Sequence, residues 1–266
     1  MNRYAATFEA LRARHETAFI PFAVAGDPDL SLSEDIFKAY VDAGADVLEV
    51  GYPFSDPVAD GPVNQRAANR AIAAGISPRR FFELMARIRR YTDIPIGILM
   101  YANTMHHVGT DTFCRRAADS GVDSILVADM PPEEADGTVD ALHRHGLQSV
   151  FIVSELTPPQ RLKAICRKVS GFVYVVSRLG TTGVQTDLST SVGTTLHRLR
   201  PATKLPLCVG FGISKPEHVV SIRNAGADGA IVGSALVATV ESLKDKPSAM
   251  LKRLSAMVRD FKRATR

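Results

Sequence analysis

The sequence lacks a long hydrophobic run and a regular set of cysteines, and each absence excludes a class of protein. No stretch of apolar residues is long enough to cross a bilayer, so the sequence predicts no membrane span and no membrane partner. The three cysteines, Cys114, Cys166 and Cys208, are odd in number and far apart, which argues against a disulfide framework or a CxxC metal site. We expect reduced thiols, with Cys208 in a buried strand.

The amino-acid sequence also predicts neither a targeting signal nor a low-complexity linker. The first residues, MNRYAATFEALRARHE, carry arginines but no continuous apolar stretch of the kind that a secretion signal or an anchor needs. No linker-like stretch divides the rest of the chain. We therefore expect a cytoplasmic protein made of one domain, residues 1–266, because a single α/β barrel commonly needs about 250 residues.

The basic excess of the chain is confined to one end. The formal net charge is +4, yet residues 244–266 hold eight Lys or Arg against two Asp, so the other residues sum to −2. Within this segment Leu251, Leu254, Val258 and Phe261 recur at helical spacing. The pattern predicts an amphipathic terminal helix with a hydrated basic face, which we favour over a nucleic-acid interface.

Short apolar segments alternate with amphipathic helical segments along the whole chain, which is typical of a parallel sheet. Eight segments have the length and composition of strands. They are Phe19–Val24, Val47–Gly51, Ile96–Met100, Ser124–Ala128, Ser149–Val153, Phe172–Val176, Leu207–Gly210 and Gly229–Val232. Eight is the strand number of the (β/α)8 TIM barrel, so we predict that fold, with an N-terminal helix and short extra helices.

A weak internal repeat supports the α/β assignment. The related segments are DAGADVLEVG at 42–51, DSGVDSILVAD at 119–129 and NAGADGAIVGS at 224–234. In each, a glycine suits the left-handed position that ends a helix, and an Asp two residues later precedes an apolar strand. A doubly wound sheet can use the same junction, so it is the strand count that favours the barrel.

The active site of such a barrel lies at the carboxyl ends of its strands, which directs attention to Glu49. Strand residues alternate between two faces, so if Leu48 and Val50 pack against helices, Glu49 points into the barrel. Burial of a carboxyl group raises its pKa toward the range that is useful for proton transfer. The alternative is a Glu paired with an interior cation, but no basic residue lies within the predicted strands.

The loop that follows, 53–62, combines three prolines with Asp56 and Asp60. Prolines restrict the backbone, so this loop can fix a carboxylate at the barrel mouth with little ordering cost. Asp60 is therefore a candidate second acid beside Glu49. At least one of the two aspartates can instead be a turn residue that bonds its own backbone.

Glycines after the late strands indicate a phosphate site. Gly212 follows the seventh predicted strand, and Gly233 and Ser234 follow the eighth at the start of a helical segment. Barrels frequently bind phosphate there through backbone N–H groups and a helix N-terminus, and Gly183 can add a further N–H group. Tight turns are the alternative reading of these glycines.

Lysine and histidine positions limit the chemistry. No lysine lies inside a predicted strand, where a Schiff-base lysine would project, so imine catalysis is not expected. His143 and His145 diverge on a helix, and His106 and His107 lack a third ligand and are predicted as surface loop residues, so no metal site is expected. The residues alone thus predict a barrel enzyme that acts on a small phosphorylated molecule with two carboxylates.

At these positions the sequence closely resembles the tryptophan synthase alpha-subunit family. The matching segments are FIPFAVAGDP at 19–28, DAGADVLEVGYPFSDPVADGP at 42–62, IGILMYAN at 96–103, SRLGTTG at 177–183, GFGIS at 210–214 and VGSA at 232–235. The resemblance implies a lyase of tryptophan biosynthesis that cleaves indole-3-glycerol phosphate to indole and glyceraldehyde 3-phosphate by a retro-aldol reaction. It implies that Glu49 is the general acid/base and that Asp60 bonds the indole N–H group.

The resemblance also implies the binding residues and a partner. The implied substrate-binding residues are Phe22, Leu99, Tyr101, Leu126, Tyr174, Thr182, Gly183, Phe211, Gly212, Gly233 and Ser234. The loop 177–191 corresponds to a lid, with Thr182 contacting Asp60 on closure. A beta subunit, in an alpha2beta2 hetero-tetramer, receives the indole and carries the pyridoxal phosphate, so no cofactor is expected in this chain. A free-standing lyase that releases indole, and a barrel that acts mainly as an allosteric activator, are the alternatives.

Three residues near the proposed site depart from the family pattern. Val24 stands where Thr is common, Tyr52 where a smaller aliphatic residue is usual, and Asn64 where an apolar neighbour of indole is expected. A buried Asn needs hydrogen-bond partners in such a pocket. For the two acids we predict a raised pKa at Glu49, which exchanges protons, and a lowered pKa at Asp60, which stays anionic.

Overall fold

Eight parallel strands close into a barrel in the computed structural model, which describes residues 2–176, 188–210 and 212–266. Each strand pairs with its neighbours in sequence, and β8 closes the ring by pairing with β1. The strands are β1 Ala18–Val24, β2 Leu48–Gly51, β3 Ile96–Met100, β4 Ser124–Val127, β5 Gln148–Ser154, β6 Val173–Val176, β7 Leu207–Gly210 and β8 Gly229–Val232. The predicted (β/α)8 barrel is confirmed.

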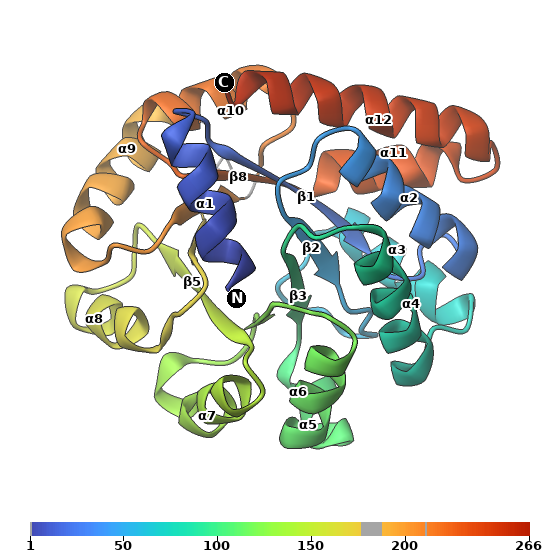
Figure 1. The fold of residues 1–266 in the computed structure, drawn as a ribbon, viewed down its shortest axis with the longest axis horizontal. Coiled ribbons are helices and arrows are strands. Elements are labelled where there is room, and N and C mark those ends of the chain that lie inside the picture. The colour runs from blue at the N-terminus through green and yellow to red at the C-terminus, as the bar shows by residue number, and fades with distance from the viewer. Residues whose placement is uncertain (1, 177–187, 211) are drawn as a thin grey trace.

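Helices surround the barrel, and several connections hold two of them (Figure 1). The helices are α1 Arg3–Ala13, α2 Leu30–Asp42, α3 Pro62–Ala73, α4 Pro78–Tyr91, α5 Ala102–Val108, α6 Thr110–Asp119, η1 Pro132–Glu134, α7 Asp136–Arg144, α8 Pro159–Lys168, α9 Leu188–Leu199, η2 Arg200–Ala202, α10 Pro216–Asn224, α11 Ser234–Leu243 and α12 Pro247–Ala264. Proline at the first position starts α3, α4 and α12, where its missing N–H group has no helical acceptor to lose. Within the described ranges, no helix has the length and hydropathy to span a membrane.

The strands separate two apolar cores because their side chains alternate between the two faces. The outward residues, such as Leu48 and Val50, pack with the surrounding helices. The inward residues form a second cluster, and Tyr4 and Phe8 of α1 belong to it. Tyr4 also shares a hydrogen bond of 2.7 Å with Ser124 Oγ on β4. The helix α1 therefore closes the amino end of the barrel, which we call the floor, and it lies across that end in Figure 1.

The internal repeat builds this floor. Its glycines, Gly44, Gly121 and Gly226, have φ angles of 102°, 84° and 91°, which are the left-handed helix ends that the sequence predicts. Each Asp that follows accepts a backbone N–H group from the strand preceding its own in the chain. The bonds join Phe19 N to Asp46 Oδ2 (2.7 Å), Ile96 N to Asp123 Oδ2 (2.8 Å) and Leu207 N to Asp228 Oδ2 (2.8 Å). The repeat thus links neighbouring strands at their amino ends.

Each of these aspartates also has a cationic partner. The ion pairs are Asp46 with Lys262 (2.8 Å), Asp123 with Arg89 (2.7 Å) and Arg3 (2.9 Å), and Asp228 with Arg200 (2.7 Å). Backbone N–H groups and a neighbouring cation both favour the charged form of a carboxylate, although burial still raises the pKa of Asp46. The floor therefore contains three aspartates, each of which is paired with at least one cation.

The helix α12 confirms the predicted terminal amphipathic helix, with one exception. Leu254, Val258 and Phe261 are buried as expected. Lys262, which the pattern places on the hydrated basic face, is only 8% exposed and also contacts Glu16 at 3.1 Å. Its carboxylate partners come from the far end of the chain, so helical periodicity alone does not reveal the contact.

Candidate active site

Glu49 occupies the interior of the barrel, as the strand alternation predicts. It lies on β2, paired with Phe22 of β1 and Gly97 of β3, and is 6% exposed. Two nearby glycines let aromatic side chains pack closely inside the barrel. A Cβ atom at Gly51 would lie 2.7 Å from the Phe22 ring, and one at Gly97 would lie 2.8 Å from the hydroxyl of Tyr4.

The carboxyl group of Glu49 has no cationic partner among the residues that the structure describes. Burial raises its pKa to about 8, and the negative charge of Asp60 adds to the rise. The rise has the predicted direction. A carboxyl group that keeps its proton near neutral pH suits both donation and uptake of a proton.

Asp60 is held at the carboxyl end of the barrel, which we call the mouth. It precedes α3, and the hydroxyl of Tyr101, which follows β3, donates to its Oδ2 at 3.0 Å. Asn64 Nδ2 donates to its Oδ1 at 3.3 Å, and Gln65 Nε2 donates to its backbone oxygen at 2.9 Å. Ala59 N donates to the same Tyr101 hydroxyl at 3.1 Å. The loop is therefore fixed to both β3 and α3.

The predicted lowering of the Asp60 pKa is wrong. Burial raises the pKa of this carboxyl group, and the hydrogen bonds from Asn64 and Tyr101 offset only part of the rise. Both donors are neutral, and neutral donors stabilise an anion less than a cation does. Because the charge of Asp60 is itself one cause of the raised Glu49 pKa, Asp60 ionises first and Glu49 second.

Asp56, the other aspartate of the loop, behaves as a turn residue. Its Oδ2 accepts the hydroxyl of the neighbouring Ser55 at 2.7 Å, and its backbone oxygen accepts Val58 N at 2.9 Å. The side chain is exposed. Asp56 thus lies in an exposed turn away from the interior, but its carboxylate bonds the Ser55 hydroxyl and not the backbone that the turn reading predicts.

Apolar side chains line the interior around the two acids. Phe22, Leu126 and Tyr174 are buried, and Leu99 packs partly buried against the same clusters. Gly210 at the end of β7 leaves the space that the Tyr174 ring and hydroxyl occupy. These predicted pocket residues come from four different strands and meet inside one barrel, which forms a wall suited to a flat apolar ring.

The three residues that depart from the family pattern occupy different places: Tyr52 lies away from the candidate site, Val24 lies in its apolar wall, and Asn64 contacts Asp60. Tyr52 packs against Phe81 of α4 and Phe113 of α6, with ring centroids 4.5 and 5.8 Å apart, so it faces the helices and not the interior. Val24 is buried in the cluster that contains Phe22. Asn64 is the departure that contacts an acid of the site.

The candidate phosphate residues lie at adjacent strand ends. Gly212 follows β7 and has a φ angle of 73°. Gly233 caps α11, its oxygen accepts the N–H groups of Leu236 and Val237, and Ser234 begins the helix at an exposed position. The first N–H groups of a helix have no helical acceptor and attract anions. Thr182, Gly183 and Phe211 lie outside the described residues.

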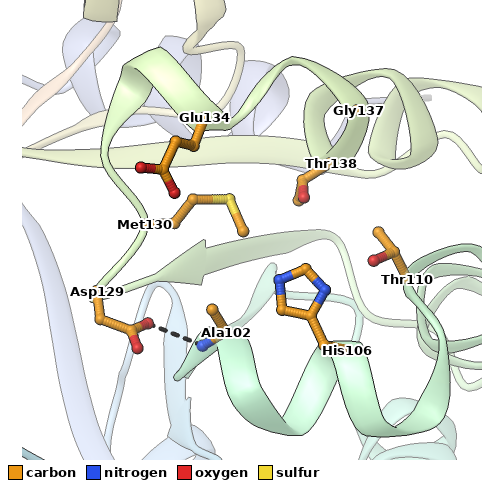
Figure 2. Close-up of a pocket in the computed structure, with 8 residues that line it drawn as sticks. All are labelled: Ala102, His106, Thr110, Asp129, Met130, Glu134, Gly137 and Thr138. Carbon is orange, nitrogen blue, oxygen red and sulfur yellow. Dashed lines mark hydrogen bonds between the residues drawn. The ribbon is translucent and has the colours of Figure 1, made fainter.

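Two clefts open beside the mouth and not over Glu49 and Asp60. One has a volume of about 430 Å³, and its lining residues are Ala102, His106, Thr110, Asp129, Met130, Glu134, Gly137 and Thr138. Figure 2 shows His106 and Glu134 pointing into it from opposite sides, while Asp129 accepts Ala102 N at 2.8 Å. The second, of about 540 Å³, includes Leu156 and Arg161. His106 is exposed as predicted, but it lies on α5 and not in a loop.

Metal chemistry has no candidate donor set in the ranges 2–176, 188–210 and 212–266. No group of three or more His, Cys, Asp or Glu side chains there is arranged to hold a metal ion. Lysines are also absent from the strands of the barrel. What the mouth does present is two carboxyl groups, an apolar wall and the start of α11.

Comparisons with known proteins agree with this arrangement. A family profile described as tryptophan synthase alpha chain matches residues 8–266. The chain belongs to this family. The alpha chain of Methanothermobacter thermautotrophicus is 45% identical over 256 residues, covering 96% of this chain and 95% of the relative. The alpha chain of Vibrio vulnificus is 44% identical over 266 residues, covering 100% and 99%.

Solved structures of the family share the fold over the whole chain. The alpha subunit from Legionella pneumophila superposes with a TM-score of 0.92 at 34% identity, covering 100% of this chain and 98% of that one. A tryptophan synthase structure from M. tuberculosis gives a TM-score of 0.89 at 29% identity, with complete coverage of both chains. Members of the tryptophan synthase alpha chain family cleave indole-3-glycerol phosphate and work with a beta subunit.

Sequence reasoning missed the polar contacts of Asp60. Its bond to Tyr101 joins residues 41 positions apart, and nothing in the local pattern predicts it. The bond to Asn64 joins residues four positions apart, but Asp60 lies before α3, so helical spacing does not predict it.

Proposed function

We propose that this chain cleaves indole-3-glycerol phosphate to indole and glyceraldehyde 3-phosphate by a retro-aldol reaction, with Glu49 and Asp60 as its two acids. The observation that carries the proposal is the pair itself. Two carboxyl groups share one barrel mouth, neither has a cationic partner in the described ranges, and their titrations are coupled. Coupled acids that ionise in sequence can take different roles in one reaction.

Glu49 has the environment required of the general acid/base. Its carboxyl group is protonated near neutral pH and can donate this proton to C3 of the indole ring. The resulting carboxylate then takes the proton of the glycerol C3′ hydroxyl. The bond between C3 and C3′ breaks, its electron pair returns to the ring, and an aldehyde leaves. Glu49 ends the cycle protonated, as it began.

Asp60 has the environment required to stabilise the cationic ring. Protonation of C3 places positive charge on the indole nitrogen, and an ionised Asp60 that accepts the indole N–H group stabilises that charge. Because the protonated ring is its own electron sink, the cleavage needs neither an imine nor a metal. We therefore assign no cofactor to this chain and expect pyridoxal phosphate only in the beta partner.

The remaining predicted residues bind the two ends of the substrate. Phe22, Leu99, Leu126 and Tyr174 supply apolar contacts to the indole ring, while Tyr101 positions Asp60. The N–H groups around Gly212 and the first turn of α11 hold the phosphate, since the positive end of a helix dipole favours an anion.

We also propose that a beta subunit covers the mouth in an alpha2beta2 hetero-tetramer, in the cytoplasm. Val58, in the loop that carries Asp60, is 83% exposed, and Leu156, after β5, is 64% exposed. Large apolar side chains exposed to this degree beside open clefts are typical of a surface that a partner covers. Both residues lie at the carboxyl end of the barrel.

Incubation with indole-3-glycerol phosphate tests the proposal, with indole and glyceraldehyde 3-phosphate followed in the presence and absence of a beta subunit. We expect both products in equal amounts and a higher rate with the partner. Leu156→Asp should reduce that stimulation while keeping the basal rate. Ile72→Asp, at an exposed position on α3, is the matched control and should keep both. No product under either condition would overturn the assignment.

The same assay separates the alternatives. A rate that the beta subunit leaves unchanged would favour a free-standing lyase that releases indole. Stimulation of the beta reaction by a chain without any cleavage activity of its own would favour an allosteric activator. Both outcomes are read from the same preparations.

A further inference from the structure

Asn64 makes a contact that the reaction scheme above does not use. It lies in the first turn of α3, and its Nδ2 donates to Oδ1 of Asp60 at 3.3 Å. Tyr101 donates to the other oxygen, Oδ2, at 3.0 Å. Each oxygen of the Asp60 carboxylate therefore has one neutral donor, and the two donors come from opposite sides of the loop, one from α3 and one from the end of β3.

The other half of the Asn64 amide has no partner. Its Oδ1 atom is buried and accepts no hydrogen bond in the described part of the chain. A buried acceptor without a donor is unfavourable, so a side chain retained for packing alone would be better replaced by an apolar one. The hydrogen bond from Nδ2 of Asn64 to Asp60 offsets the free-energy cost of the unpaired Oδ1 atom.

Asp60 depends on such donors because no cation among the described residues faces it. The titratable groups around it are Glu49 from β2, Tyr101 after β3 and Tyr174 from β6, and α3 contributes the neutral Asn64. None of these supplies positive charge in the absence of substrate. The ionised form of Asp60 is thus favoured by Tyr101 and Asn64, and loss of either donor favours the protonated form.

We propose that Asn64 is a positioning residue that holds the ionised carboxylate of Asp60 in the orientation that accepts the indole N–H group. This inference rests on the proposed function, in which Asp60 is the acceptor. With Oδ1 of Asp60 held by α3 and Oδ2 held from β3, the carboxylate plane has little freedom to turn, so its remaining lone pairs keep a fixed direction in the mouth. An aliphatic residue at position 64 would hold the carboxylate on one side only.

The test removes the hydrogen-bond donor at position 64 and compares the result with a variant that keeps it. Asn64→Leu removes the amide, and Asn64→Gln keeps an amide on a longer side chain. Gln65→Leu is the matched control, because it removes an amide that bonds the backbone oxygen of the same Asp60. We would measure kcat and KM between about pH 5 and about pH 9, and the carboxyl titration of Asp60 by ¹³C NMR, with Asp60→Asn to assign the signal.

Asn64→Leu should lower kcat/KM about tenfold and shift the acid limb of the pH profile upward by about one unit, the change that one pKa unit of lost anion stabilisation produces. Asn64→Gln should restore much of the profile. Gln65→Leu should leave the limb in place whatever its effect on the rate. An active Asn64→Leu chain with the same acid limb and the same Asp60 titration as the original would overturn the inference.

The NMR titration separates this inference from the proposed function. If the original chain fails to cleave indole-3-glycerol phosphate, the proposed function fails, whereas an upward shift of the Asp60 titration in Asn64→Leu still supports the contact. If Asn64→Leu does not fold, Asn64→Ala removes the same donor without adding bulk and takes its place. An unshifted titration in both folded variants contradicts the role of Asn64.

Discussion

The floor and the mouth of the barrel hold the same residue type in opposite surroundings. At the floor, Asp46, Asp123 and Asp228 each accept a backbone N–H group and face a cation. At the mouth, Glu49 and Asp60 have no cation beside them in the described ranges. Charge pairing, and not burial alone, thus separates the carboxylates of the floor from the two that we propose take part in the reaction.

The two surroundings have different physical consequences. A carboxylate that is paired with a cation and accepts a backbone N–H group links the strands that it joins. A carboxyl group that is buried without a cation has a pKa displaced toward neutral pH, so it can gain and lose a proton during a reaction. Stability should therefore depend on the floor and activity on the mouth.

The largest expected effect is on catalysis, from Glu49→Gln at the mouth. The amide fills the same space but cannot exchange a proton, so kcat should fall by about 10²- to 10⁴-fold, the range attributed to a positioned acid or base. Indole release under saturating substrate measures it. Thermal stability should not decrease, because a buried carboxyl group without a partner is removed. A cleavage rate equal to that of the original chain would contradict the assignment.

The next effect is on stability, from Asp123→Asn at the floor. The change leaves Arg89 largely buried without its anion, so we expect a loss of about 3 kcal/mol in the free energy of unfolding. Denaturant unfolding measures it, and kcat of the folded fraction should stay within about twofold. Glu83→Gln, which breaks an exposed pair with Arg79, is the control and should change stability little. A strong loss of kcat with unchanged stability would remove the contrast between floor and mouth.

The smallest expected effect, counted per pH unit, is the pH dependence that Glu49 imposes on stability. Its pKa is raised to about 8 in the folded chain from an ordinary value of 4.5, so the folded state binds the extra proton between these values. The associated stability is present below the lower value and is lost as the pH rises through the higher one. The original chain should lose up to about 1 kcal/mol per pH unit relative to Glu49→Gln over this interval. Parallel curves for the two proteins would contradict the raised pKa.

The sequence predicted the fold and the inward direction of Glu49 because both follow from local periodicity. Alternation along β2 places Leu48 and Val50 on one face and Glu49 on the other. The left-handed glycines at the helix ends were equally readable, since Gly44 lies where an amphipathic segment stops and an apolar one begins. These features depend on neighbours within a few residues.

The features that the sequence did not predict depend on distant neighbours. The direction of the Asp60 pKa shift follows from its burial and from the lack of a cation around it within ranges 2–176, 188–210 and 212–266, which only the closed barrel reveals. Lys262 is buried because Asp46 and Glu16 lie beside it in space and not in sequence. Tyr52 turns outward because Phe81 and Phe113 form a pocket for it between two helices.

The helix α1 has a consequence for the passage of molecules through the barrel. Tyr4, Phe8 and Leu11 pack into the amino end of the barrel, so that end is closed and molecules reach the interior through the mouth. The substrate and both products therefore pass through the mouth. A product that stays bound there blocks the next substrate. If a beta subunit covers the mouth as we propose, it determines where the apolar product goes.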